Sequence, residues 1–174
     1  MQEEIFNSNE KDQKFFRDAF AKLGNRRCIK HFAMTYECLK RFVKDDIVLT
    51  AIKNVSEYKA DYFACQMAHG DTDVMLGLSG NVDAMLYLAS SIAGEEFTTI
   101  NEDSYDAMCE FTNLANGQFA AFLEDEGMEM DVVPPMCCEN CNITANGNFC
   151  VLTLLINDKE LDIISVIDLI PYMT

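Results

Sequence analysis

Apolar residues recur at helical spacing in four stretches of this chain. The stretches are residues 15–23, 32–42, 81–94 and 101–125. In each of them apolar side chains repeat every three or four positions, as they do on the buried face of a helix. Asn81 and Asn101 begin the last two stretches, where an asparagine side chain caps a helix, and Gly94 ends the third. We therefore expect helices there, the first two being either separate helices or one kinked helix.

Short apolar segments bounded by turn residues predict strands. These segments are residues 47–51, 55–60, 61–68, 73–79, 128–133, 149–156 and 160–170. Gly70-Asp71 and Asn157-Asp158-Lys159 separate consecutive segments and are typical of hairpin connections. Residues 136–147 lack a clear apolar pattern and are expected to form a loop. The whole pattern predicts an α+β fold, with a largely antiparallel sheet of hairpin strands packed against two or more long helices.

The composition is that of a folded protein. The chain has 174 residues, of which 49% are hydrophobic and 24% are charged. That length suits one domain with a substantial core. No long linker divides the chain, so we interpret residues 28–174 as a single domain and residues 1–27 as an N-terminal extension or an extra helix.

The formal net charge of −16 narrows the choice of partners. A surface this acidic repels phosphate backbones and anionic lipids, so we expect neither nucleic acid nor a membrane as a partner. A basic surface on another protein remains compatible with it. The polar N-terminus does not resemble a secretion signal, and no apolar run approaches the ~20 residues of a membrane-spanning helix. We therefore expect a cytoplasmic protein.

The predicted helix at residues 101–125 carries a polar stripe. The stripe consists of Asp106, Glu110, Asn113 and Gly117. Positions three and four apart lie on one face of a helix, so these four residues share one side. The apolar residues of the same helix are centred roughly 150° away; they are Tyr105, Met108, Ala115, Phe119, Phe122 and Leu123. We expect the stripe to face outward while the apolar face holds the helix on a core.

A glutamate followed three positions later by an asparagine is a weak signal. The pair occurs at residues 4–7, 110–113 and 139–142. Only the middle pair also has an acidic residue four positions before the glutamate and a glycine four positions after the asparagine. The full four-residue pattern is therefore much more specific than the pair.

This pattern resembles the CheX-type chemotaxis phosphatases, within a wider group that includes CheC and the middle domain of the flagellar switch protein. The family pattern is Asp or Ser, then Glu, Asn and Gly at this spacing on a long helix. Gly127, Asp131 and the pair Pro134-Pro135 also fall where the family places a Gly, an Asp and two prolines. The resemblance covers roughly residues 60–170 and is compatible with residues 28–59, but it does not explain residues 1–27.

The resemblance implies an enzyme that removes the phosphoryl group from the aspartyl phosphate of CheY, the response regulator that sets flagellar rotation. Asn113 would orient the attacking water, and Glu110 would pair with a lysine of the phosphorylated regulator. Mg²⁺ would be held by the regulator, so we expect no cofactor or metal in this chain. The family also implies a homodimer formed by pairing sheet edges, for which residues 149–156 and 160–170 are candidates.

Several interpretations stay open at this point. Asp106 either contacts the partner or supports Glu110, one turn away. Gly117 either leaves clearance for the partner's backbone or permits close helix packing, since a glycine inside a helix costs about 1 kcal/mol relative to alanine. The alternative function is a non-catalytic module that docks a response regulator or a flagellar switch component. A third possibility is an acidic scaffold without a phosphorylated partner.

The cysteines and histidines give weaker signals. Cys137, Cys138 and Cys141 form a cluster with a C-x-x-C spacing, but no second pair has the spacing of a zinc ribbon. We expect ordinary thiols there, because a reducing cytoplasm disfavours disulfides. His31 and His69 lie on separate predicted elements, so no Cys–His nucleophilic pair can be argued from them.

Overall fold

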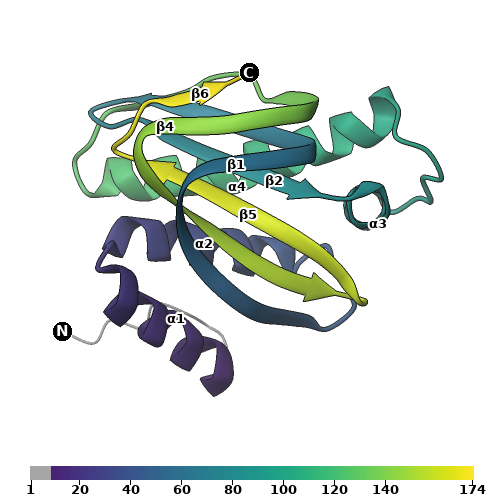
Figure 1. Cartoon of the computed structure of the whole chain (residues 1–174), viewed down its shortest axis with the longest axis horizontal. Coiled ribbons are helices and arrows are strands. Elements are labelled where there is room, and N and C mark those ends of the chain that lie inside the picture. Colours follow the sequence, from purple (N-terminus) through teal and green to yellow (C-terminus); the bar gives the residue numbers. More distant parts are fainter. Residues whose placement is uncertain (1–8) are drawn as a thin grey trace.

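Helices cover one side of an antiparallel sheet, as the computed structural model of the chain shows for residues 9–174 (Figure 1). The helices in this range are α1 (Glu10–Leu23), α2 (Arg26–Leu39), α3 (Val82–Ala93) and α4 (Glu102–Asp125). The strands are β1 (Ile47–Gly70), β2 (Val74–Gly80), β3 (Met130–Val132), β4 (Met136–Ile156), β5 (Lys159–Ile167) and β6 (Pro171–Met173). The predicted α+β class is confirmed.

An asparagine caps the N-terminus of each of these helices. The four caps are Asn9, Asn25, Asn81 and Asn101. Each side-chain oxygen accepts from a backbone N–H that the helix itself leaves without a partner. Gly24 ends α1 with a φ of 68°, so residues 10–39 form two helices and not one kinked helix. No helix within residues 9–174 is both long and apolar enough to cross a membrane.

Two strands are longer than the sequence pattern predicts. β1 joins three predicted segments into one strand, with shifts of register between Leu49 and Ala51 and between Val55 and Glu57. These irregularities interrupt the alternation of side chains without ending the pairing. The loop predicted at residues 136–147 is wrong, because this segment is the first half of β4. It is exposed along much of its length, so its apolar alternation is weak.

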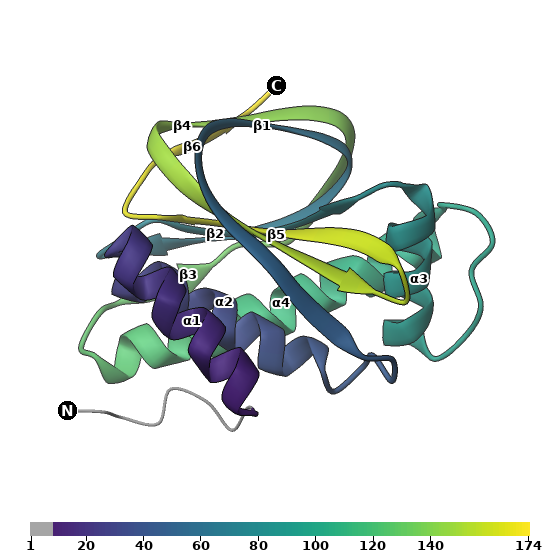
Figure 2. The same ribbon diagram turned by 60° about the horizontal axis from the view of Figure 1, so that its bottom comes forward.

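The strands β1, β2, β5 and β4 close into a ring (Figure 2). β1 pairs with β2, β2 with β5, β5 with β4, and β4 returns to β1, all antiparallel. β3 and β6 add short pairings to β1 and β4. The interior of the ring is filled by a cluster of buried side chains that includes Phe63, Cys65, Met75, Phe149, Val151, Ile164 and Val166.

The closed ring changes the expectation for dimer formation. Residues 149–156 of β4 lie between β1 and β5, and β5 lies between β2 and β4. Both segments are therefore paired on both sides, and the prediction that their edges are open for a second copy is wrong. Periodicity alone does not reveal this, because the partner on the second side comes from the distant residues 47–55.

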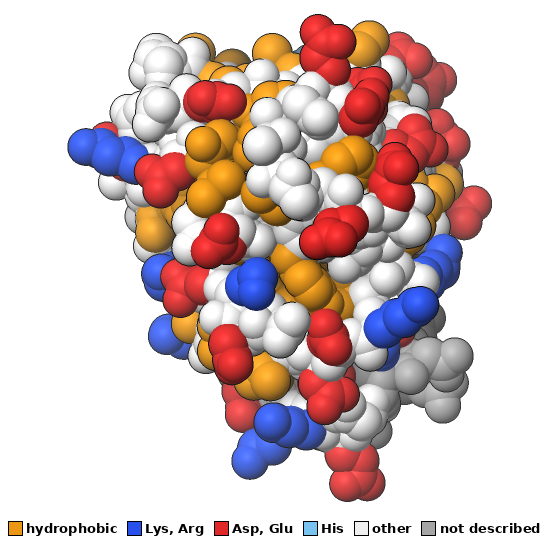
Figure 3. All heavy atoms as spheres, turned by 90° about the vertical axis from the view of Figure 1, so that its right-hand side faces the viewer, with side chains coloured by type: hydrophobic (Ala, Val, Ile, Leu, Met, Phe, Trp, Pro, Cys, Tyr) orange, Lys and Arg blue, Asp and Glu red, His pale blue; other side chains and the backbone are white. Residues whose placement is uncertain are grey.

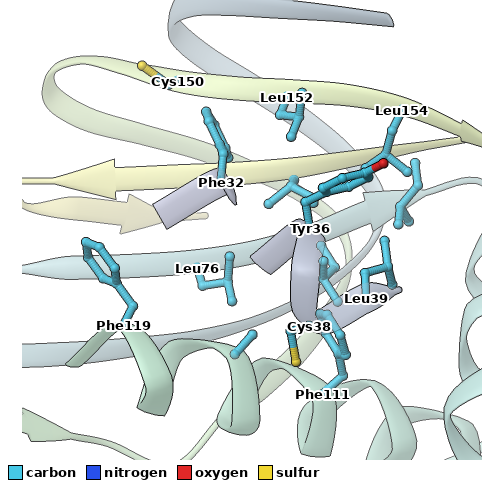
Figure 4. Packing of buried hydrophobic residues seen from close by; sticks show 14 of the residues in the cluster. Phe32, Tyr36, Cys38, Leu39, Leu76, Phe111, Phe119, Cys150, Leu152 and Leu154 are labelled. Atoms are coloured by element: carbon cyan, nitrogen blue, oxygen red, sulfur yellow. The ribbon is translucent and has the colours of Figure 1, made fainter. Parts of the chain in front are cut away.

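The second core lies between the outer face of the ring and the helices. Side chains from α2 and α4 point toward β2 and β4 there (Figure 4); they include Phe32, Tyr36, Leu39, Phe111 and Phe119. Phe16 of α1 is 1% exposed and belongs to the same cluster. The predicted N-terminal extension thus contains a helix that packs on this core, while residues 1–8 lie outside the described range.

Candidate functional site

Helix α4 places the polar stripe on the surface. Met108, Ala115, Phe119 and Leu123 are buried in the helix-side core, and Tyr105 and Phe122 pack against it. On the opposite side Asp106, Glu110 and Asn113 are exposed and Gly117 is half-buried. The structure thus brings the four predicted site residues together on one outward face.

The two carboxylates of the stripe have no hydrogen-bonding or ion-pair partner among residues 9–174. Within residues 9–174, neither the Asp106 nor the Glu110 side chain makes a hydrogen bond or an ion pair, and both residues are exposed. No contact therefore supports the interpretation that Asp106 braces Glu110. Both negative charges face solvent, where a positively charged group can approach them.

Gly117 leaves an open space on the stripe. A methyl group built on its Cα would meet no neighbouring atom within 4 Å in the part of the chain that the structure describes. Helix packing therefore does not require a glycine at this position. The gap is on the same side of the helix as Asn113, so it widens the approach to that side chain.

Asn113 is held by a buried residue that sequence analysis did not identify. Gln66 of β1 is 1% exposed, and its Nε2 donates to Oδ1 of Asn113 at 2.7 Å. Ala64 and Ala68, two positions away on either side, belong to the helix-side core, so Gln66 points toward α4 as strand alternation requires. A polar residue among the buried positions of a strand is the signal that marks it.

Gln66 is one of four buried polar residues on the helix side of the sheet, which we call the polar chain: Ser165, His31, Asn116 and Gln66. They form two hydrogen-bonded pairs, and within residues 9–174 no hydrogen bond joins His31 to Asn116. Asn116 Nδ2 donates to the backbone oxygen of Gln66 at 3.3 Å. His31 Nδ1 lies 2.8 Å from Ser165 Oγ, and its ring stacks on Phe119 with centroids 4.2 Å apart. Asn116 is fully buried.

Burial determines the protonation of His31. Removal from water lowers the pKa of His31 to about 3, although the Asn116 side chain acts in the opposite direction. The imidazole is therefore neutral near pH 7. A neutral ring fits the complete burial of this side chain.

The first half of α4 is also fastened to β4. The hydroxyl of Tyr105 donates to Glu139 Oε1 at 2.6 Å. Cys109 Sγ and Cys137 Sγ lie 3.2 Å apart, and Cys137 Sγ also lies 3.9 Å from the backbone oxygen of Tyr105. These contacts and the Gln66 bond fix α4 against the sheet from two strands.

The cysteine cluster differs from the expectation of ordinary thiols. Cys138 and Cys141 form a disulfide within β4, where a residue with positive φ, Asn140, lies between them. Cys137 stays reduced and faces α4. Across residues 9–174 no group of three or more His, Cys, Asp or Glu side chains is arranged to hold a metal ion.

The surface near the start of α4 is acidic. Asp and Glu side chains are spread over the end of the molecule that holds α3, where they are more numerous than the Lys and Arg side chains among them (Figure 3). Glu102 and Asp103 occupy the first turn of α4, where their negative charges interact favourably with the positive end of the helix dipole. The approach to the stripe is therefore electrostatically suited to a basic surface.

The sequence of this chain matches one known protein family. The family model described as "Chemotaxis phosphatase CheX" matches residues 62–155, a range that includes both Gln66 and the stripe. No curated protein is similar enough in sequence to count as a match.

Solved structures share the fold at low sequence identity. The chemotaxis protein CheX from Desulfovibrio desulfuricans is 17% identical, with a TM-score of 0.67 over 79% of this chain and 95% of that one. A CheC-like superfamily protein from Shewanella sp. PV-4 is 19% identical, with a TM-score of 0.70 over 82% and 98%. A CheX–CheY–BeF3–Mg²⁺ complex from Borrelia burgdorferi matches with 13% identity and a TM-score of 0.62 over 79% and 94%.

Proposed function

Because the chain belongs to the CheX family of chemotaxis phosphatases, we propose that it hydrolyses the aspartyl phosphate of a CheY-type response regulator. The observation that carries this proposal is the exposed amide of Asn113, held at a fixed position by buried Gln66. A protein that only docks a partner gains nothing from such an amide. The complex of a fold neighbour with CheY, BeF3 and Mg²⁺ supports the same class of partner.

The chemistry requires a well-placed water. An aspartyl phosphate is an acyl phosphate, whose carboxylate is a good leaving group. The water oxygen attacks phosphorus, the bond from phosphorus to the aspartyl oxygen breaks, and one water proton is released. Positioning dominates such a reaction, so a strong base is unnecessary.

Asn113 is equipped to position that water. A carbonyl oxygen has two acceptor sites, and Gln66 occupies one of them on Oδ1. The second site of Oδ1 can accept a water O–H and direct the water lone pair toward phosphorus. The Nδ2 group is left to donate to the water or to a phosphoryl oxygen.

Glu110 and Asp106 supply contacts to the regulator in this proposal. Glu110, one turn before Asn113 and without a partner of its own among residues 9–174, would pair with the regulator's active-site lysine. Asp106, one turn further, offers a second carboxylate to a basic surface. Exposed pairs of this kind contribute ~0.2–1 kcal/mol each and weaken with salt.

The regulator would supply the rest of the site. It carries the phosphoryl group and, in this proposal, the Mg²⁺ that neutralises its oxygens, so this chain needs no cofactor of its own. The acidic surface described above disfavours nucleic acid and anionic membranes as partners. We place the protein in the cytoplasm, where a response regulator of this class acts.

The deciding experiment follows phosphate release from a phosphorylated CheY-type regulator with Mg²⁺ present. We expect the wild-type protein to accelerate it, and Asn113→Ala to lower the rate by about 10²-fold because water positioning is lost. Glu110→Ala should weaken regulator binding more than it slows the bound complex. A wild-type protein that binds the regulator without accelerating the release would instead be the non-catalytic docking module.

The variant Gly117→Ala distinguishes the two roles considered for this glycine, which are clearance for the regulator's backbone and close helix packing. Among the described residues the added methyl group meets no neighbouring atom within 4 Å, so the free energy of unfolding should stay the same or rise by up to about 1 kcal/mol. The methyl group should obstruct the regulator and raise KM. Thermal unfolding and steady-state kinetics on the same preparation measure both effects, and an unchanged KM would remove the clearance role.

A homodimer remains a proposal. In the described residues the first part of β1, residues 47–61, pairs only with β4 and therefore keeps one open edge. A second copy could pair with it there, because open edges tend to be covered. Sedimentation at micromolar concentration tests this proposal, and a monomer would remove it.

A further inference from the structure

Two of the reduced cysteines differ from the other cysteines of the chain in their exposure and in their closeness to each other. All eight cysteines lie within residues 9–174, and Cys138 and Cys141 form a disulfide. Four of the free thiols are buried: Cys28, Cys38, Cys65 and Cys150. The remaining two, Cys109 and Cys137, are both half-buried and are neighbours in space.

We propose that Cys109 and Cys137 form a site of reversible oxidation by hydroperoxides, at which a disulfide joins α4 to β4. Their Sγ atoms are 3.2 Å apart, whereas the bond requires about 2 Å, so a combined movement of about 1 Å suffices. The two residues come from different elements, so the bond would link the site helix covalently to the sheet.

The surroundings favour Cys109 as the first sulfur to react. The hydrogen bond with Cys137 lowers the pKa of the Cys109 thiol, while burial and the nearby Asp106 carboxylate oppose this. The same hydrogen bond and burial raise the pKa of Cys137. Because the thiolate is the nucleophile toward peroxides, Cys109 is the attacking group and Cys137 the resolving one.

The reaction balances with a hydroperoxide as the oxidant. The Cys109 thiolate attacks one oxygen of H2O2, the O–O bond breaks, and hydroxide leaves, which gives a sulfenic acid. Cys137 then attacks the Cys109 sulfur, the S–O bond breaks, and the sulfenic oxygen leaves as water once protonated. Two thiols and one peroxide thus give one disulfide and two waters.

The disulfide would act directly on the site. Cys109 immediately precedes Glu110 and lies one helical turn before Asn113. Pulling this turn toward β4 would shift Asn113 relative to Gln66, and a displacement of about 1 Å can cost up to ~10²-fold in rate. We expect the oxidised protein to hydrolyse the aspartyl phosphate about tenfold more slowly, an expectation that rests on the proposed phosphatase function.

Peptide mapping detects the modification without any activity. Residues 60–158 contain no Lys or Arg, so a glutamate-specific protease is needed in place of trypsin. After H2O2 treatment and alkylation of free thiols, cleavage without reduction should give residues 103–110 linked to residues 130–139, which the Cys138–Cys141 bond joins in turn to residues 140–160. Dithiothreitol should separate these peptides. Recovery of Cys109 and Cys137 as alkylated or over-oxidised thiols would overturn the proposal.

Two serine variants connect the bond to the rate. Cys109→Ser and Cys137→Ser should each keep the wild-type rate in reductant and lose sensitivity to peroxide. Either variant retains the Cys138–Cys141 pair, so its insensitivity excludes that disulfide as the cause. A rate that stays constant although the cross-link has formed would overturn the regulatory effect. A wild-type protein that is inactive in reductant would refute the phosphatase, and the peptide map would still decide the oxidation site.

Discussion

The two cores of this protein lie on opposite faces of the same strands and differ in chemistry. The core inside the ring is mainly apolar, with Phe63 and several Ile and Val residues, and its buried polar residues form a separate group in which Tyr58 and Thr153 donate to Asp162. The core on the helix side is equally well buried but contains the polar chain, from Ser165 to Gln66. Within residues 9–174, the helix-side core is the one that touches the proposed site, through Gln66.

Apolar burial and buried hydrogen bonds contribute differently: the first stabilises the folded state, and the second orients a particular side chain. Apolar burial stabilises by about 25 cal/mol per Å² without imposing an orientation on any group. A buried polar group is costly unless it is hydrogen-bonded, and its bonds have preferred angles. The hydrogen bond from Gln66 therefore adds little to stability, but it sets the angle at which the Asn113 amide meets the solvent.

Gln66→Leu should give the largest effect on the proposed activity. Leucine cannot donate to Asn113 Oδ1, so we expect kcat to fall by about 10²-fold. The free energy of unfolding should change by less than about 1 kcal/mol, because leucine fits an apolar site and Gln66 Oε1 has no hydrogen bond within residues 9–174. Kinetics and chemical denaturation provide the two values.

The control for Gln66→Leu is regulator affinity. Binding of a CheY-type regulator loaded with BeF3 and Mg²⁺ should be unchanged, since Gln66 is buried and touches no partner. A parallel loss of binding and of kcat would show that Gln66 holds the whole helix and does not orient one amide.

His31 should give the next largest effect, on stability. Its pKa is about 3 in the folded protein, against an ordinary value of 6.5, so between these values the unfolded chain binds a proton that the folded chain does not. Stability therefore rises with pH across this window. On lowering the pH from about 7 to about 5 we expect a loss of about 2 kcal/mol from His31 alone.

Denaturant titrations at several pH values measure the His31 effect, with His31→Gln as the comparison. The variant should lose that part of the slope, while contributions from carboxyl groups remain in both proteins. Equal slopes would mean that the imidazole is already solvated in the folded state.

Ile164→Val, inside the ring, should give the smallest effect. Ile164 is fully buried in the ring cluster, and removal of one methylene group there costs about 1 kcal/mol. The rate of phosphate release should be unchanged, because within residues 9–174 the hydrogen bond to the Asn113 side chain comes from Gln66 on the helix side and not from this cluster. Thermal unfolding and kinetics together test whether the two cores are independent.

The helices could be predicted because their signals are local. Asn81, Gly94 and Asn101 mark ends that the structure confirms, and the spacing of apolar residues on α4 separated its buried face from its stripe. The direction of the stripe followed from residues within the helix itself. The roles of Asp106, Glu110, Asn113 and Gly117 remain predictions.

The ring could not be predicted because its signals are distant. Residue 47 pairs with residue 156, and nothing local to either segment indicates the other. Gln66 was missed for a related reason. Its position among the buried residues of β1 is visible only once Ala64 and Ala68 are known to face the helices. Its partner Asn113 belongs to a different element.

The register of β1 has a consequence for the order of folding. Local caps allow α4 to form early, whereas closing the ring brings together segments at opposite ends of the domain, which is slow. A slip of β1 by one residue would turn Gln66 into the ring and place a neighbouring apolar side chain under α4. A chain with formed helices and an unfinished ring would therefore display the complete stripe and still lack a correctly held Asn113.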